Sequence, residues 1–213
     1  MDQLKLPHRL VLLDHLQPES SPVVGEDKLD PLVALAVIAE TYMMEKIAFD
    51  GDILAITQSS KTGHSLIDDV IALAEEREEN YSLVAFARLI ANRNKPYRHV
   101  LDNLIENQVL KVRNRKILGI SLSKTIVPFR KQVVTVVLDY IKKLADQQNL
   151  NLRDYLTLYI MQQTRLKENM SGNLETASLT ETTDNKSVFN LFNQAVDEIV
   201  SSGQTTASMR HNG

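Results

Sequence analysis

The chain contains no cysteine and no tryptophan among its 213 residues. Without cysteine, neither a disulfide framework nor a thiolate metal site can form. No uninterrupted apolar run approaches the roughly 18 residues that a membrane-spanning helix requires. The amino terminus also lacks a basic leader followed by an apolar stretch and a small-residue cleavage site. We therefore expect a protein of a reducing, cytoplasmic compartment, whose contact with any membrane is peripheral.

Motifs of catalysis and of phosphate binding are also missing. A phosphate-binding loop needs glycines before its lysine, but the Lys-Thr-Gly triplet at 61–63 carries its only glycine afterwards. Together with the S-x-x-K match at 121–124, the triplet resembles two motifs of penicillin-recognising serine enzymes, but in reversed order. We interpret the stretch as a turn followed by a helix with Ser65 as N-cap and Asp68 as its N3 partner.

Histidines and carboxylates do not form a metal-site pattern either. The five histidines show neither H-x-H nor H-x-x-x-H spacing. Asp68 and Asp69 are adjacent, so they point to different faces of a helix. We expect no enzymatic activity, no metal and no cofactor.

Apolar spacing predicts a mainly α-helical fold in a single multi-helix domain. Asp30 and Pro31 are expected to open the second helix, as its cap and first residue. The segment 131–147 is rich in β-branched residues, but its length and its ending favour a buried helix. The helices are predicted near 6–16, 31–46, 65–78, 81–92, 96–107, 131–147, 151–166 and 188–201.

Two segments repeat the order helix, strand, turn, strand. In 37–56, two short apolar runs flank Asp50-Gly51-Asp52, which predicts a tight hairpin. In 100–120 the same order recurs, and the polar residues 113–116 are interpreted as a turn two residues longer. Both units resemble the end of a winged-helix unit, so two short β-hairpins should decorate the helical domain.

Composition sets the expected boundaries. Residues 1–167 are assigned to the helical domain, and 168–187, rich in Ser, Thr and Asn, to a flexible polar loop. Residues 188–201 should add a last helix to the same domain, and 202–213 a disordered tail.

Charge is unevenly distributed although the net charge is only −3. Residues 93–131 contain ten Lys or Arg against two acids, a local balance of +8, whereas 66–80 contain six acids against one arginine. Clustered cations attract polyanions, and this attraction weakens with salt. We predict an anionic headgroup site formed by Arg93, Lys95, Arg98, Arg113, Arg115, Lys116, Arg130 and Lys131.

Two physical features support this prediction. Three of the cations surround Pro96, where free amides at the start of a helix favour phosphate. Others lie at the expected turn at 113–116 or just beyond it. At about 1 kcal/mol for each basic residue near an anionic leaflet, a handful gives useful peripheral binding.

Four stretches in order resemble the Golgi phosphoprotein 3 family, over about residues 4–166. They are "LKLPHRLVLL" at 4–13, "VIAETYMMEKIAF" at 37–49, "TGHSLIDDVIAL" at 62–73 and "VLDNLIENQVLKV" at 100–112. The resemblance implies a mainly helical domain with short hairpins and no enzymatic activity. It also implies binding of phosphatidylinositol 4-phosphate at a Golgi-type membrane.

The family's headgroup residues are replaced in this chain. The family pocket uses a tryptophan and three arginines, whereas this chain has no tryptophan and the arginine positions fall near Ala34, Asn94 and Tyr97. The expected anionic ligand therefore depends on the neighbouring cations at 93, 95 and 98.

Two alternatives remain open. The helix-plus-hairpin units could bind nucleic acid, with "KVRNRK" at 111–116 as a basic wing on the phosphate backbone. The preceding helix has two acids and no arginine after Arg98, which suits base reading poorly, so nucleic acid is the less favoured partner. Alternatively, a protein partner could bind the 168–187 loop or the last helix. The oligomeric state is left open.

Overall fold

The computed structural model describes the backbone of residues 4–16, 22–76, 81–117, 120–147, 149–169 and 186–209. These ranges form eight α-helices, one 3-10 helix and two two-stranded antiparallel sheets, which confirms the mainly α fold. In chain order the elements are α1 (Leu6–Asp14), α2 (Glu26–Met43), β1 (Ile47–Asp50), β2 (Ile53–Ile56), α3 (Ser65–Glu76), α4 (Leu83–Asn94), α5 (Pro96–Glu106), β3 (Leu110–Ile117), β4 (Ile120–Pro128), α6 (Lys131–Ala145), α7 (Leu152–Gln163), η1 (Arg165–Asn169) and α8 (Lys186–Met209).

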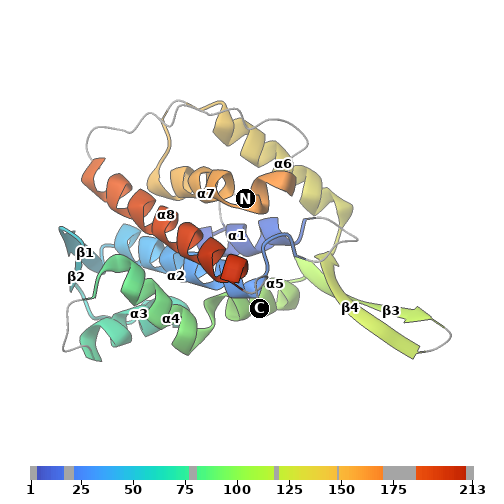
Figure 1. Ribbon diagram of the computed structural model, residues 1–213, viewed down its shortest axis with the longest axis horizontal. Coiled ribbons are helices and arrows are strands. Elements are labelled where there is room, and N and C mark those ends of the chain that lie inside the picture. The colour runs from blue at the N-terminus through green and yellow to red at the C-terminus, as the bar shows by residue number, and fades with distance from the viewer. Residues whose placement is uncertain are drawn as a thin grey trace.

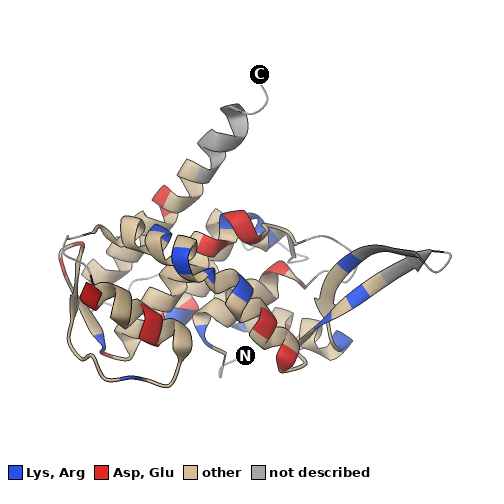
Figure 2. Cartoon of the chain, turned by 90° about the horizontal axis from the view of Figure 1, so that it is seen from below, with Lys and Arg blue, Asp and Glu red and all other residues tan. Residues whose placement is uncertain are grey.

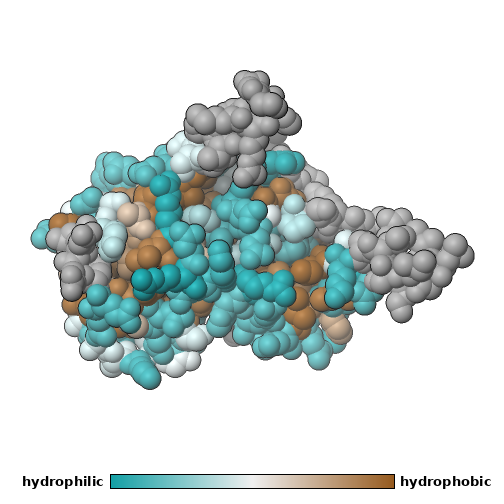
Figure 3. Space-filling view, turned by 60° about the horizontal axis from the view of Figure 1, so that its bottom comes forward, coloured by the Kyte–Doolittle hydropathy of each residue, from teal (hydrophilic) through white to brown (hydrophobic). Residues whose placement is uncertain are grey.

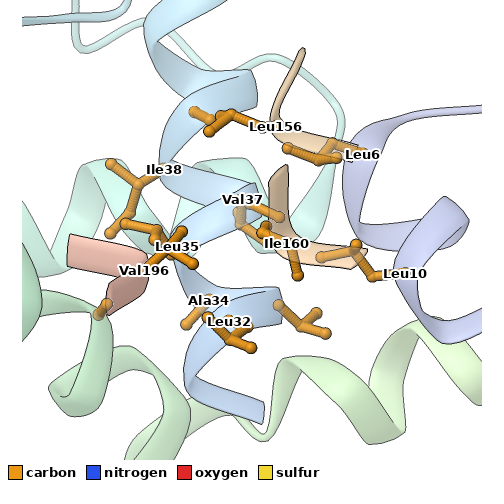
Figure 4. Close-up of a cluster of buried hydrophobic side chains, with 14 of the residues drawn as sticks. Leu6, Leu10, Leu32, Ala34, Leu35, Val37, Ile38, Leu156, Ile160 and Val196 are labelled. Atoms are coloured by element: carbon orange, nitrogen blue, oxygen red, sulfur yellow. The ribbon is translucent and has the colours of Figure 1, made fainter. Parts of the chain in front are cut away.

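Helix α2 forms the centre of the molecule. From Leu29 to Thr41 every residue except Pro31 is buried, as expected for a helix that is apolar all round. Helices α1, α3, α4, α5, α7 and α8 all pack against it (Figure 1). Figure 4 shows side chains of α1, α7 and α8 converging on α2, among them Leu10, Ile160 and Val196. One continuous core therefore joins the N-terminal and C-terminal helices.

The start of α2 differs from the prediction. Asp30 and Pro31 do not open the helix, which begins at Glu26 after Gly25 and contains Pro31 in its interior. Gly25 has a φ of +85°, a conformation that glycine adopts without a Cβ penalty. The Asp14 carboxylate accepts hydrogen bonds from the backbone amides of Val24 and Gly25. These bonds hold the chain just before Glu26, where α2 begins. Asp30 is thereby left free to cap another helix.

The cap of α3 also differs. Ser65 is the first residue of the helix, and the amide of Asp68 bonds to the carbonyl of His64. The Asp68 carboxylate accepts hydrogen bonds from the amide and hydroxyl of Thr62, at 2.7 and 2.8 Å. These bonds lower the pKa of Asp68. The carboxylate therefore closes the 62–68 loop instead of forming a capping box with Ser65.

The first hairpin confirms its prediction. Strands β1 and β2 pair with Asp50 opposite Ile53, so Gly51 and Asp52 form a two-residue turn. Gly51 has a φ of +63°, as a first turn residue of type II′ requires.

The second hairpin is longer than predicted. Residues 113–116, interpreted as a turn, lie inside β3. Residues 118–119, between the two strands, lie outside the described residues. Figure 1 shows the strands projecting from the helical body, and residues 111–114 are all exposed. A strand that packs against no core does not need apolar residues at every second position. Its run of polar residues therefore has the same sequence pattern as a turn.

Toward the C-terminus the boundaries shift. The helix predicted at 188–201 is α8, which begins at Lys186 and continues to Met209, so 202–209 are helical rather than part of a tail. Most of the predicted 168–187 loop, residues 170–185, lies outside the described residues. The segment 131–147 confirms its helical prediction as α6.

The surface is largely polar. Hydrophilic side chains cover most of the face in Figure 3, and apolar groups reach it in separate patches. Within the described ranges, no helix combines the length and apolarity needed to cross a bilayer.

Candidate anion-binding surfaces

Three of the predicted site residues lie at the junction of α4 and α5. Helix α4 ends at Asn94, Lys95 takes a left-handed φ of +46°, and α5 starts at Pro96. Arg93, Lys95 and Arg98 are all exposed. Because a single residue connects the helices, the three side chains share a small area. We call them the junction cluster.

Carboxylates lie beside two members of the junction cluster. Arg93 Nη1 is 3.7 Å from Glu76 Oε2 on α3, and Arg98 Nε is 3.2 Å from Asp102 Oδ2 one turn further along α5. Exposed pairs of this kind contribute only about 0–1 kcal/mol to stability. They nevertheless place negative charge where an anionic ligand would have to bind.

The amides at the start of α5 are not all free, contrary to the expectation for this helix end. The Tyr97 amide donates to Asp30 Oδ1 at 2.8 Å, and Asp30 is only 5% exposed. Burial raises the pKa of Asp30, while the Tyr97 amide and Lys95 oppose the rise. A carboxylate of the protein thus occupies part of the anion-binding end of α5.

Tyr97, near a position where the resembling family has an arginine, belongs to a buried network. Its hydroxyl donates to Asp14 Oδ2 at 2.8 Å, and His15 Nε2 lies 2.9 Å from the same hydroxyl. Burial, followed by the charge of Asp14, raises the pKa of Tyr97 far above its usual range. Burial lowers the pKa of His15. This position therefore ties α1 to α5 and supplies no cation.

A second group of cations surrounds Phe129 at the base of the β3–β4 hairpin. Lys111 Nζ lies 5.5 Å from the Phe129 ring centroid, and Arg130 Cζ lies 5.8 Å from it. Arg113 follows Lys111 by two residues and so shares its face of β3. Lys131 begins α6, and all four cations are exposed. We call Lys111, Arg113, Phe129, Arg130 and Lys131 the hairpin patch.

The hairpin patch has no carboxylate partner in the part of the chain that the structure describes. The reason is visible in the sequence, which contains no acid between Glu106 and Asp139. In Figure 2 the charged residues in the described part of the hairpin are all Lys or Arg, whereas the helical body carries both basic and acidic residues. The cations of the patch are therefore available to an external anion.

Six of the eight predicted residues thus fall into two groups, three in the junction cluster and three in the hairpin patch. Helix α5 has 11 residues, about 16 Å of helix, and lies between the junction cluster and β3. Arg115 and Lys116 belong to β3, opposite Ser123 and Ser121, but their side chains lie outside the described part. Arg113 is in the strand rather than in the predicted turn.

Apolar side chains reach solvent on the elements that carry the hairpin patch. Val112 on β3 is 45% exposed and Val136 on α6 is 56% exposed. Val112 lies between Lys111 and Arg113 in the strand and therefore points to the opposite face of β3.

Sequence reasoning missed a buried charge network between α1, α2 and α7. Arg9, only 1% exposed, donates to the Asp154 carboxylate. Arg153 donates twice to the Glu40 carboxylate, at 2.6 and 2.7 Å. The Leu6 amide also donates to Glu40, so this residue caps α1. Two signals were visible in the sequence: Arg9 in the leucine-rich α1 and Glu40 in the apolar part of α2.

Comparison with known protein families gives a match over most of the chain. A family model described as Golgi phosphoprotein 3 (GPP34) matches residues 6–201, from the start of α1 into α8. No curated protein matches the chain. The match includes both hairpins and both groups of cations.

Proposed function

Because the chain belongs to the Golgi phosphoprotein 3 family, which is linked in general to lipid-binding or adaptor roles, we propose that it is a non-enzymatic peripheral membrane protein that binds anionic phospholipid headgroups. The observation that carries this proposal is the hairpin patch, whose exposed cations have no carboxylate partner among the described residues.

The charge of the hairpin patch suits a cytoplasmic membrane surface. Four cations at about 1 kcal/mol each contribute about 4 kcal/mol of attraction to an anionic leaflet. The projecting hairpin lets these cations approach the surface while the acids of the helical body stay further away (Figures 1 and 2). Phe129, which is partly exposed between Lys111 and Arg130, adds apolar area that can enter the headgroup region.

We propose recognition by charge density rather than by a stereospecific pocket. Phosphatidylinositol 4-phosphate is the headgroup that the family resemblance favours. Alanine, asparagine and tyrosine near the family's arginine positions, at 34, 94 and 97, support a less selective mode. Binding should then follow the charge of the bilayer, with similar affinity for phosphatidylserine and phosphatidylinositol 4-phosphate at equal surface charge.

Liposome flotation tests the proposal. Neutral phosphatidylcholine vesicles should leave the protein in solution, and vesicles containing either anionic lipid should carry it upward. Combining Lys111→Ala, Arg113→Ala, Arg130→Ala and Lys131→Ala should weaken binding several hundredfold, since each 1.4 kcal/mol is about tenfold. Undiminished binding by this variant would remove the hairpin patch as the membrane site.

The junction cluster supplies the matched control. Arg93→Ala, Lys95→Ala and Arg98→Ala remove three exposed cations, two of which already have carboxylate neighbours. We expect this variant to lose less than about tenfold in affinity. If instead it loses binding while the hairpin variant retains it, the junction cluster is the lipid site.

Nucleic acid is the second candidate, because β3 exposes Lys and Arg in the manner of a basic wing. Duplex DNA added in place of liposomes separates the two functions. DNA binding that falls steeply with salt and disappears in the hairpin variant, without liposome flotation, would favour nucleic acid.

A further inference from the structure

A pocket of about 440 Å³ lies between α1, α2, α5 and the loop before α3. Small-molecule sites commonly occupy about 300–1,000 Å³. Its floor contains the buried apolar side chains of Val37, Ile67 and Leu104, and its rim contains exposed residues such as His64 and Asn107. No residue of the hairpin patch or the junction cluster lines it. The pocket is therefore a separate feature of the fold.

Two polar atoms of residues that line the pocket are buried without a hydrogen-bond partner. They are Lys5 Nζ and His8 Nδ1, both from the start of the N-terminal helix. Folded proteins satisfy nearly all buried polar groups, so an unpaired ammonium and an unpaired ring nitrogen in one pocket need an explanation.

The charges around Lys5 do not balance within the protein. Glu40 bonds to Arg153 and to the Leu6 amide, and Asp154 bonds to Arg9. Lys5 is therefore a further cation near Glu40, a carboxylate that already has partners. One negative charge in the pocket would complete the balance. A carboxylate carries one charge, whereas a phosphate monoester would bring an excess.

His8 requires a hydrogen-bond donor. Its Nε2 lies 3.2 Å from Asn103 Oδ1, which also accepts from Asn107 Nδ2. Because Asn103 Oδ1 is an acceptor, His8 Nε2 carries the proton and Nδ1 presents its lone pair. Burial lowers the pKa of His8, which keeps the ring neutral. A hydroxyl of a bound molecule could satisfy Nδ1.

We propose that this pocket binds a small hydroxy carboxylic acid. Lys5 Nζ and His8 Nδ1 are enclosed, so both side chains shift toward the pocket when the acid binds. Its carboxylate then pairs with Lys5 Nζ, its hydroxyl donates to His8 Nδ1, and its carbon chain lies on the apolar floor. At the mouth, Ser65 Oγ and His99 Nε2 lie 3.1 Å apart and join the start of α3 to α5. The loop that follows Lys61 thereby forms part of the rim.

Isothermal titration calorimetry of the intact protein tests the proposal. The probes are 2-hydroxyhexanoate, 3-hydroxyhexanoate, hexanoate, hexyl phosphate and the neutral 1,2-hexanediol. One or both hydroxy acids should bind more tightly than hexanoate and hexyl phosphate, and the diol should not bind. Failure of both hydroxy acids to bind at millimolar concentration, or tighter binding of hexyl phosphate, would overturn the proposal.

Two variants test the assigned contacts. Lys5→Met keeps the unbranched side chain but removes the charge, and it should weaken binding of the acids at least tenfold. Lys61→Met, at an exposed lysine outside the lining, is the matched control and should bind as wild type does. His8→Phe should abolish the preference for the hydroxylated acids over hexanoate. Unchanged binding by Lys5→Met would contradict the proposal, and circular dichroism checks the fold of each variant.

The result does not depend on membrane binding. The variant with four alanines in the hairpin patch retains every residue that lines the pocket. It should therefore bind the hydroxy acid as wild type does while losing liposomes, so failure of one proposal can be told from failure of the other.

Discussion

The junction cluster contains three cations and the hairpin patch contains four, yet their surroundings differ. Arg93 and Arg98 have carboxylates from α3 and α5 beside them, and a third carboxylate, Asp30, occupies the start of α5. Lys111 and Arg130 instead flank an aromatic ring on a projecting hairpin. The difference teaches that the number of basic residues in a segment does not decide how much of their charge an external ligand can use.

Packing explains the difference. Helices that pack together bring charges of both signs into contact, as Arg93 of α4 meets Glu76 of α3. The hairpin contacts the body only through its base, mainly against α5 and α6 among the described elements, and it has no acids of its own. Lys95 is intermediate between the two cases. It has no ion pair among the described residues, but it lies close enough to Asp30 to oppose the rise in the pKa of that carboxyl.

Asp30→Ala should have the largest effect on stability. The buried Tyr97 amide would lose its acceptor, which costs about 1–3 kcal/mol in the free energy of unfolding. The vacated end of α5 should then bind anions, so inorganic phosphate should stabilise the variant more than wild type. Urea unfolding with and without phosphate measures both effects.

Asp27→Ala is the control, because Asp27 is an exposed acid in the first turn of α2, the helix that also carries Asp30. It should change stability by less than about 1 kcal/mol and should gain no response to phosphate. Equal stability of the two variants would mean that Asp30 contributes little to the start of α5.

Removing the neighbouring carboxylates should make the junction cluster behave more like the hairpin patch. Glu76→Gln combined with Asp102→Asn leaves Arg93 and Arg98 without their partners. At about 1 kcal/mol for each of the two released cations, affinity for anionic liposomes should rise by up to about thirtyfold.

The control for this pair must change the net charge equally. Glu45→Gln and Glu75→Gln remove two exposed acids that form no ion pair within the described residues. A clearly smaller gain is expected from them. Equal gains would show that net charge, and not the position of the carboxylates, separates the two clusters.

Much of the fold could be predicted because its signals are local. Apolar spacing located the eight α-helices of the described chain, and Asp50-Gly51-Asp52 located the first hairpin. The second hairpin was predicted, but its length was not. Its polar strand residues have no core to face, so strand and turn carry the same pattern in the sequence.

The site was less predictable because partners come together only in the fold. Asp30 lies 67 residues from Tyr97. Glu40 lies 113 residues from Arg153, and Arg9 lies 145 residues from Asp154. The sequence therefore shows which segments are rich in cations, while the carboxylates that accompany some of these cations depend on helix packing.

Asp30→Asn tests whether charge or hydrogen bonding matters at the start of α5. Asparagine keeps an oxygen for the Tyr97 amide, so the change in stability at neutral pH should stay below about 1 kcal/mol. The raised pKa of Asp30 means that the folded state binds its proton more tightly than the unfolded state does. The stability gained from this tighter proton binding is fully present below the pKa that Asp30 has in the unfolded chain. It is lost as the pH rises through the higher pKa that Asp30 has in the folded protein.

Wild type should therefore gain stability relative to Asp30→Asn as the solution is acidified from about pH 7 toward about pH 4. Urea unfolding of both proteins across this range measures the difference, and effects common to both cancel. A constant difference would contradict the raised pKa, and with it the placement of a buried charge at this helix end.

The smallest effect is expected for the exposed pair of Arg98 and Asp102. A double-mutant cycle with Arg98→Ala and Asp102→Ala should give a coupling energy of about 0.3–0.5 kcal/mol, because the two side chains are one turn apart and are 57% and 48% exposed. In about 1 M salt the coupling should disappear, since the Debye length falls to about 3 Å. A coupling that survives this salt concentration would mean that the pair is shielded from solvent, and Arg98 would then be less available to a ligand than its exposure indicates.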